Sequence, residues 1–129
     1  MNRKFRWSAI VFAAALLFGA GYAAAQAHFA QPKTVLQISI IKFRDGISDE
    51  DGQRVIDGVK QVAAKIPGIK NVWLKAARME PRDFDAVIVI EFVNREAADR
   101  YAESPIHDAW SRELQRVRLT SISPQVTNP

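Results

Sequence analysis

Two side chains in the C-terminal half of the sequence are suited to moving a proton. Tyr101 and His107 lie six residues apart, with Pro105 between them. On one continuous helix they would point in different directions, but a helix break at Pro105 would let the two rings converge. A neutral His in the first turn of a helix can accept a proton, and a Tyr hydroxyl can donate to a carbonyl or enolate oxygen. The pair therefore favours proton abstraction next to a carbonyl. A core Tyr and a helix-capping His would show the same spacing.

Other catalytic patterns are absent from the sequence. The chain has no Cys, and its only His residues are His28 and His107, so no two of them have the spacing of a metal site. It contains neither a Gly-rich phosphate loop nor a Gly-x-Ser-x-Gly element. The acidic residues at positions 49–51, 83 and 85 are interpreted as cap and turn residues. We therefore expect no metal and no cofactor.

The elements that must position the Tyr–His pair alternate along the chain. A first helix is expected from the cap residue Ser48 to Pro67. A second helical region follows the cap residue Asn94 and is split at Pro105. Strands rich in apolar and β-branched residues are expected at Thr34–Phe43, Ile69–Ala77, Ala86–Phe92 and Leu119–Val126. This β-α-β-β-α-β order predicts an α+β, ferredoxin-like fold with helices on one face of an antiparallel sheet.

Both faces of that sheet are expected to be apolar. The strand Ala86–Phe92 is apolar at both alternating sets of positions, and the first strand carries Leu36, Ile38 and Ile40 on one side. Helices cover only one face, so the second would stay in water at a cost of about 25 cal/mol per Å². A second copy of the chain is the simplest cover, which predicts a homodimer through the sheet faces.

The N-terminal segment has the three zones of an export signal. Met1–Arg6 is cationic, Ala9–Phe18 is apolar, and small residues follow up to Ala25. We expect residues 1–25 to be removed before Gln26 and the protein to be exported, either periplasmic or secreted. Cleavage before His28 is the alternative site, and retention as a membrane anchor is the alternative fate.

Removal of the signal changes the charge of the protein. The formal net charge of +4 falls to +1, because 15 Lys and Arg then face 14 Asp and Glu. A nearly neutral exported domain disfavours a nucleic-acid partner. The mature chain is expected to consist of a flexible lead at residues 26–33, one domain at residues 34–126 and a tail at residues 127–129.

Four segments of the sequence, taken in their order along the chain, resemble segments of the stress-responsive A/B barrel domain family. Members of that family are dimeric α+β barrels. The last of them, RYAESPIHDAW, is similar to an element of that family with a Tyr, two residues and then His-Pro-x-His. The segments are Val35–Asp51, Lys65–Val72, Asp83–Phe92 and Arg100–Trp110.

The resemblance implies a ferredoxin-like fold, a dimer formed by sheet-to-sheet packing, and a cavity between each sheet and its helices. Members include plant stress proteins and a plant polyketide cyclase that closes a ring by aldol chemistry without a cofactor. The Tyr and His that act in that cyclase match Tyr101 and His107. Other His positions of the family fall on Ser104 and Gln37 here, and Phe84 begins the segment that matches a frequent Tyr-x-His. Candidate ligand-binding residues are Gln37, Ser39, Trp73, Phe84 and Trp110.

Two classes of function fit these observations. The first is a binding protein that holds a small apolar or aromatic molecule in the sheet–helix cavity. The second is a cofactor-independent cyclase or lyase in which His107 is the base and Tyr101 the acid. A haem-degrading or quinol-type monooxygenase of the same superfamily is a third, more distant, alternative.

Overall fold

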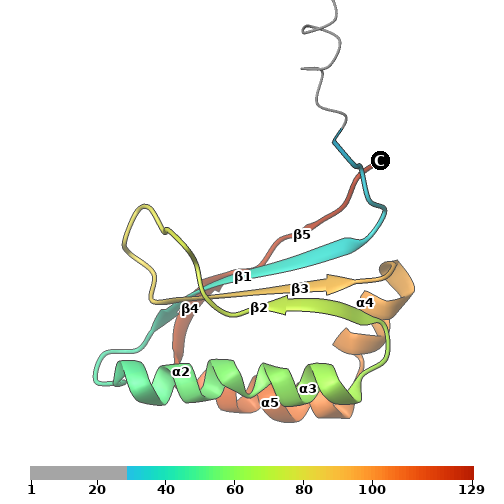
Figure 1. Cartoon of the computed structure of the whole chain (residues 1–129). Coiled ribbons are helices and arrows are strands. Elements are labelled where there is room, and N and C mark those ends of the chain that lie inside the picture. The colour runs from blue at the N-terminus through green and yellow to red at the C-terminus, as the bar shows by residue number, and fades with distance from the viewer. Residues whose placement is uncertain (1–28) are drawn as a thin grey trace, which may run out of the picture. The chain divides into compact units, whose positions relative to one another are not determined.

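The computed structural model describes residues 29–129, so the expected signal segment, residues 1–25, lies outside the described residues. Figure 1 shows helices on one side of a single sheet. The elements in chain order are β1 (Val35–Phe43), α2 (Asp49–Asp57), α3 (Val59–Lys65), β2 (Ile69–Trp73), β3 (Ala86–Phe92), α4 (Arg95–Ala102), α5 (Pro105–Val117), β4 (Arg118–Ile122) and β5 (Gln125–Val126).

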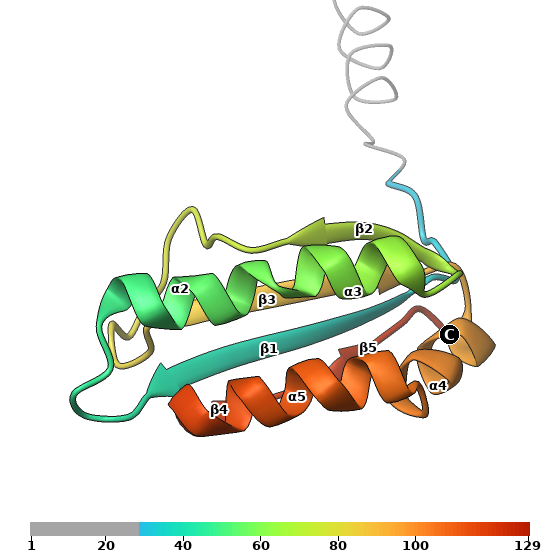
Figure 2. The same ribbon diagram turned by 90° about the horizontal axis from the view of Figure 1, so that it is seen from below.

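The strands form one antiparallel sheet with the order β2-β3-β1-β4, and β5 pairs with β1 beside β4. In the central pair, Val35 lies opposite Phe92 and Ile41 opposite Ala86. Figure 2 shows α2 and α3 running along β2 and β3, while α5 runs along β1 and β4. The predicted ferredoxin-like fold is confirmed.

Polar caps begin the helices where the sequence predicts them. Ser48 Oγ accepts from the backbone N–H of Asp51 at 3.1 Å and starts α2. Asn94 Oδ1 accepts from the N–H of Ala97 at 2.9 Å and starts α4. Each cap supplies an acceptor to an N–H in the first turn that has no partner within the helix.

The first helical region is interrupted, whereas the sequence predicts one helix. It divides at Gly58, and the carbonyl of Val55 in the last turn of α2 accepts a hydrogen bond of 2.8 Å from the indole Nε1 of Trp110. A Cβ on Gly58 would lie 3.1 Å from the Trp110 ring, so Gly at this position lets α5 approach closely. The indole from the neighbouring helix thus satisfies a carbonyl at the break.

The second and last strands differ in length from the prediction. The second strand ends at Trp73 rather than near Ala77, and the last is divided into β4 and β5 around Pro124. The expected tail is hydrogen-bonded to the chain at the start of the domain. The Thr127 hydroxyl donates to the Thr34 carbonyl at 2.9 Å, and the Asn128 amide donates to the carbonyl of Pro32, in the expected lead, at 2.7 Å. None of the helices within residues 29–129 is long and apolar enough to cross a membrane.

The hydrophobic core lies between the helices and one face of the sheet. Gly52 of α2 lies directly against the Phe43 ring of β1, which leaves no room for a Cβ at this position. The largest fully buried side chains are Tyr101, Phe92, Ile41, Ile56, Ile88, Ile90 and Val59. The opposite face of the sheet carries the other alternating set of β1 and β3, which includes Leu36, Ile38, Ile40, Val87 and Val89. We call this set, with Trp73 and Ile122, the open face.

Candidate active site between the sheet and α5

The structure brings the rings of Tyr101 and His107 into contact. Tyr101 is in the last turn of α4 and His107 is in the first turn of α5, and their ring centroids are 4.4 Å apart. A tight connection makes this possible, because the N–H of Ser104 donates to the Tyr101 carbonyl at 3.2 Å. The Ser104 hydroxyl then caps α5, and Pro105 occupies its first turn.

The pair belongs to a row of aromatic rings. The Phe92 ring at the end of β3 lies 5.1 Å from the Tyr101 ring, and the Trp110 ring lies 6.1 Å from that of His107. These are contact separations for tilted aromatic rings. The imidazole is therefore held on both sides by side chains from different elements.

Burial sets the protonation state of both groups. Tyr101 is 2% exposed, and burial raises the pKa of its phenol, so the hydroxyl stays protonated and able to donate. Burial lowers the pKa of His107, against smaller opposing effects of the Asp108 carboxylate and the Ala102 backbone carbonyl. A neutral imidazole beside a protonated phenol can accept one proton while the phenol stabilises an oxyanion.

One nitrogen of His107 is isolated. Nδ1 is buried and has no hydrogen-bond partner in the described part of the chain, since the nearest carboxylate oxygen, Asp108 Oδ1, is 3.8 Å away. The side chain as a whole is still 21% exposed. The accessible part of the ring is therefore the edge away from Nδ1.

The rings of Tyr101, His107 and Trp110 line a small cavity of about 80 Å³ between the sheet and α5. Gln37 and Ser39 reach it from the helix-facing side of β1, and both are among the residues predicted to bind a ligand. Trp110, another of them, is also present, although its indole N–H is engaged by Val55. The complete lining is Gln37, Ser39, Ile88, Ile90, Tyr101, His107, Trp110, Ser111, Leu114, Arg118 and Ser123.

Polar groups gather where β1 meets the C-terminal segment. The Ser123 hydroxyl donates to that of Ser39 at 3.3 Å, and the Gln125 amide donates to the Gln37 side-chain oxygen at 3.1 Å. One end of the cavity is therefore aromatic, while this polar side is built from hydroxyls and amides.

Three polar residues of the lining, Ser111, Arg118 and Ser123, were not among the sequence candidates. Ser111 and Arg118 follow His107 at spacings of four and eleven residues, which place all three on one side of a helix and its continuation. That periodicity places Ser111 and Arg118 on the same side as His107, but it does not indicate a cavity there. Ser123 carries no such signal, because its position depends on strand pairing.

Two predicted ligand-binding residues lie elsewhere. Trp73 pairs with Val89, so it belongs to the open face, and it is 47% exposed. Phe84 lies in the loop between β2 and β3 and lines a different hollow. Neither Trp73 nor Phe84 lines the cavity with Tyr101, because β2 ends before the loop and its last residue faces away from the helices.

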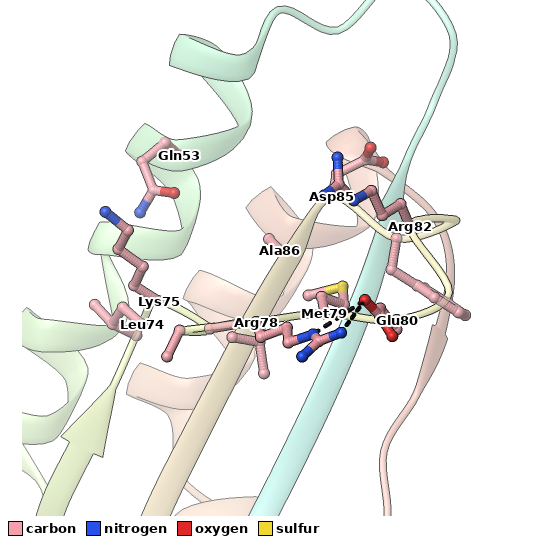
Figure 3. Close-up of a pocket in the computed structure, with 13 residues that line it drawn as sticks. Gln53, Leu74, Lys75, Arg78, Met79, Glu80, Arg82, Asp85 and Ala86 are labelled. Atoms are coloured by element: carbon pink, nitrogen blue, oxygen red, sulfur yellow. Dashed lines mark hydrogen bonds and ion pairs between the residues drawn. The ribbon is translucent and has the colours of Figure 1, made fainter.

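That second hollow is larger, at about 980 Å³, and is formed mainly by the loop between β2 and β3 (Figure 3). Three of its five charged side chains, Arg78, Glu80 and Asp85, have hydrogen-bond partners. The Arg78 guanidinium donates to Glu80 at 2.7 Å, and the Asp85 carboxylate accepts from the Phe43 N–H at 2.7 Å. The Tyr–His pair is not part of its lining. We therefore assign the candidate site to the smaller cavity.

A metal site is not formed by the residues that the structure describes. Within residues 29–129 no group of three or more His, Cys, Asp or Glu side chains could hold a metal ion. The polar groups that line the cavity are an imidazole, a phenol, an amide, an indole, several hydroxyls and one guanidinium.

The comparisons with known proteins agree with this fold. The profile of the stress responsive A/B barrel domain matches residues 35–123. No match to the chain is found among curated proteins.

Three similar solved structures illustrate the relationship. A dimeric ferredoxin-like protein of unknown function from Bacteroides fragilis is 20% identical, with a TM-score of 0.62 over 76% of this chain and 99% of that one. SnoaB, a cofactor-independent oxygenase from Streptomyces nogalater, is 16% identical, with a TM-score of 0.63 over 75% of this chain and 94% of SnoaB. The hydroxynitrile lyase of Passiflora edulis is 12% identical, with a TM-score of 0.66 over 74% of this chain and 93% of the lyase. At these identities the likeness shows the fold.

Proposed function

The chain belongs to the stress-responsive A/B barrel domain family, and on that premise we propose that it is a homodimer that binds a small molecule between its sheet and α5. The observation that carries the binding proposal is the enclosed contact of Tyr101 with His107. Both rings line the cavity, and both are held in protonation states suited to a ligand with a carbonyl or hydroxyl group. A His that only capped a helix in solvent would not need this enclosure.

The open face supports the homodimer. Leu36, Ile38 and Ile40 of β1 lie beside Val87 and Val89 of β3, and no helix of the described chain covers them. Trp73 and Ile122 extend this surface and are 47% and 54% exposed. A similar structure from Bacteroides fragilis is described as dimeric. Pairing two such faces would remove the apolar area of both copies from water.

The cavity limits what can be bound. Its volume is about 80 Å³, so it suits a molecule of few non-hydrogen atoms. Most of its lining carries a polar atom. Both features favour a short, polar molecule over the apolar or aromatic ligand expected from the sequence.

The binding proposal is tested by closing the cavity. Ser111 faces the cavity from α5, so Ser111→Leu fills it, whereas Gln115→Leu places the same side chain on the exposed side of that helix. Small molecules that copurify with each folded variant are identified by mass spectrometry. We expect a molecule present in the parent protein and in Gln115→Leu to be lost from Ser111→Leu. Equal retention in both variants, or no bound molecule in the parent protein, would contradict the proposal.

A second candidate is a cofactor-independent enzyme of the lyase or cyclase type. The neutral His107 and protonated Tyr101 favour it, since one can remove a proton from a carbon next to a carbonyl while the other donates to the enolate oxygen. Two proteins of similar fold, an oxygenase described as cofactor-independent and a hydroxynitrile lyase, are enzymes.

Deuterium exchange separates the two candidates. A carbonyl compound such as acetoacetamide is incubated with the protein in D₂O, and the loss of its α-proton signal is followed by NMR. An enzyme of this type would accelerate the exchange, and His107→Gln would abolish the acceleration. A binding protein would leave the exchange rate at its uncatalysed value.

We also propose that the protein is exported. The cationic, apolar and small-residue zones of residues 1–25 support this. Mass spectrometry of the exported fraction is expected to show a chain that begins at Gln26. A full-length chain that stays with the membrane would instead indicate an anchor.

A further inference from the structure

One positive charge lines the cavity without a negative partner. Arg118 is the first residue of β4, is half-buried, and lies opposite Phe43 on the helix-facing side of the sheet. Its Nη1 donates to the Ser121 hydroxyl at 3.2 Å. No Asp or Glu of residues 29–129 forms an ion pair with it.

The neighbouring arginines behave differently. Arg116 is exposed and forms a 3.1 Å ion pair with Glu113, and Arg44 donates to the backbone carbonyl of Gln115 at 3.4 Å. Neither lines the cavity. Arg118 is thus distinguished from both by its partial burial and its place in the lining.

The rest of the lining does not supply that counter-charge. It contains no carboxylate, and Ser39, Ser123 and Gln37 are neutral. A guanidinium withdrawn from water without an anion loses hydration that a single hydroxyl only partly replaces. Its planar fork of N–H donors matches the two oxygens of a carboxylate.

We propose that the ligand of this cavity is a short carboxylic acid, with its carboxylate bound by Arg118 and its carbonyl or hydroxyl group against Tyr101 and His107. The proposal rests on the proposed binding function and names its ligand class. The hydroxyls of Ser39 and Ser123 lie on the same lining and offer further hydrogen bonds. The small volume limits the acid to a short chain.

The probe is acetoacetate, and acetoacetamide is its uncharged counterpart with the same carbon skeleton. Binding of each to the full chain is measured by NMR at one ionic strength. We expect the acid to bind more tightly than the amide by roughly tenfold or more, since a hydrogen bond to a charged group contributes more than a neutral one.

Substitution identifies the group that recognises the charge. Arg118→Gln is expected to bring the affinities for acid and amide to within about twofold, because the amide side chain keeps hydrogen-bonding capacity but has no charge. Arg116→Gln removes the same charge from the exposed end of α5 and is expected to leave the preference for the acid unchanged. Thermal unfolding of both variants checks that they are folded.

Several results would overturn the proposal. Equal affinity of the parent protein for acid and amide would exclude recognition of the carboxylate, and this comparison needs no variant. The proposal also fails if neither probe binds. It fails as well if inorganic phosphate displaces acetoacetate with equal affinity, since the site would then take any oxyanion. The proposed binding function is decided separately by the molecule that copurifies with the parent protein and Gln115→Leu.

Discussion

The two faces of the sheet carry opposite kinds of side chain from the same strand. On the helix-facing side of β1, Val35, Ile41 and Phe43 are buried, but Gln37 and Ser39 between them are polar. On the open face the intervening positions are apolar, from Leu36 through Ile38 to Ile40. The covered side of this strand is therefore more polar at its centre than the uncovered side.

The polar residues on the covered side and the apolar residues on the open face are suited to different functions. A domain that only had to fold as a monomer would gain from apolar residues under the helices and polar residues towards water. The polar residues under the helices line a cavity, which is where a ligand would need hydrogen bonds. The apolar residues on the open face are suited to a partner surface, because their burial contributes about 25 cal/mol per Å² only if something covers them.

The largest expected effect comes from placing a charge at the centre of the open face. Ile38→Glu would bury a carboxylate from each copy in a sheet-to-sheet dimer, at several kcal/mol per ion. Dimerisation is expected to weaken by roughly a thousandfold or more, which corresponds to about 4 kcal/mol. Light scattering across a range of protein concentrations measures the change.

The matched control for this charge is Gln61→Glu on the exposed side of α3. It adds the same charge away from the sheet and should leave the mass of the assembly unchanged. If Ile38→Glu stays dimeric at the same concentrations as the parent protein, the open face is not the interface.

The two faces can also be compared by shortening one side chain on each of them to Ala in the monomeric Ile38→Glu protein. Ile90 is 2% exposed and faces the helices, whereas its neighbour Val89 belongs to the open face. In the Ile38→Glu protein, Ile90→Ala is expected to lower the free energy of unfolding by about 2–5 kcal/mol, and Val89→Ala by less than about 1 kcal/mol. Urea denaturation measures both, and similar losses would show that the two faces do not differ in burial.

The smallest expected effect is a pH dependence that belongs to the helix-facing side. Burial lowers the pKa of His107 in the folded chain from its usual 6.5. As the pH falls below 6.5, the unfolded chain takes up this proton first, so stability falls until the pH passes the lowered pKa and then levels off. The groups around the ring are the Asp108 carboxylate, the Tyr101 phenol and, across the cavity, Arg118.

His107→Gln is expected to remove this part of the slope when unfolding free energies are compared below pH 6.5. The control is Glu91→Gln, on the opposite side of the sheet from His107. It is expected to leave the slope just below pH 6.5 unchanged. A hydrogen bond from Asn71 is the largest cause that holds the pKa of Glu91 below its usual 4.5, so its titration falls in a lower range. An unchanged slope in His107→Gln would mean that the ring titrates as it does in water.

Local signals in the sequence account for most of the fold. Alternation in the segments 34–43 and 86–92 predicts both faces of the central strands, and the structure has them in these positions. Ser48, Asn94 and Pro105 predict the starts of three helices, because caps and proline act through their own backbone and that of the next turn. The break at Gly58 was not predictable, since it involves a hydrogen bond from Trp110, which is 55 residues from Val55 in the chain.

The candidate site was predictable only in part. The helix break at Pro105 led to Tyr101 and His107, and the resemblance to the family added Gln37. Phe84 lies in a loop outside this lining, and Trp73 is outside it because an aromatic side chain at the end of a strand can face either side of the sheet. One residue more or less in the strand reverses its direction.

The sequence by itself determined the order of the elements, the two apolar faces of the central strands and the helix break at Pro105 that lets the Tyr and His rings converge, because each depends on residues close together in the chain. Only the tertiary structure decided that Arg118 and Ser123 share a cavity with Ser39 and His107, and that this cavity is small. The physical reason is that β4 is aligned with β1 by pairing across nearly 80 residues, and α5 packs against both. No local pattern specifies that register or the volume left between the packed layers.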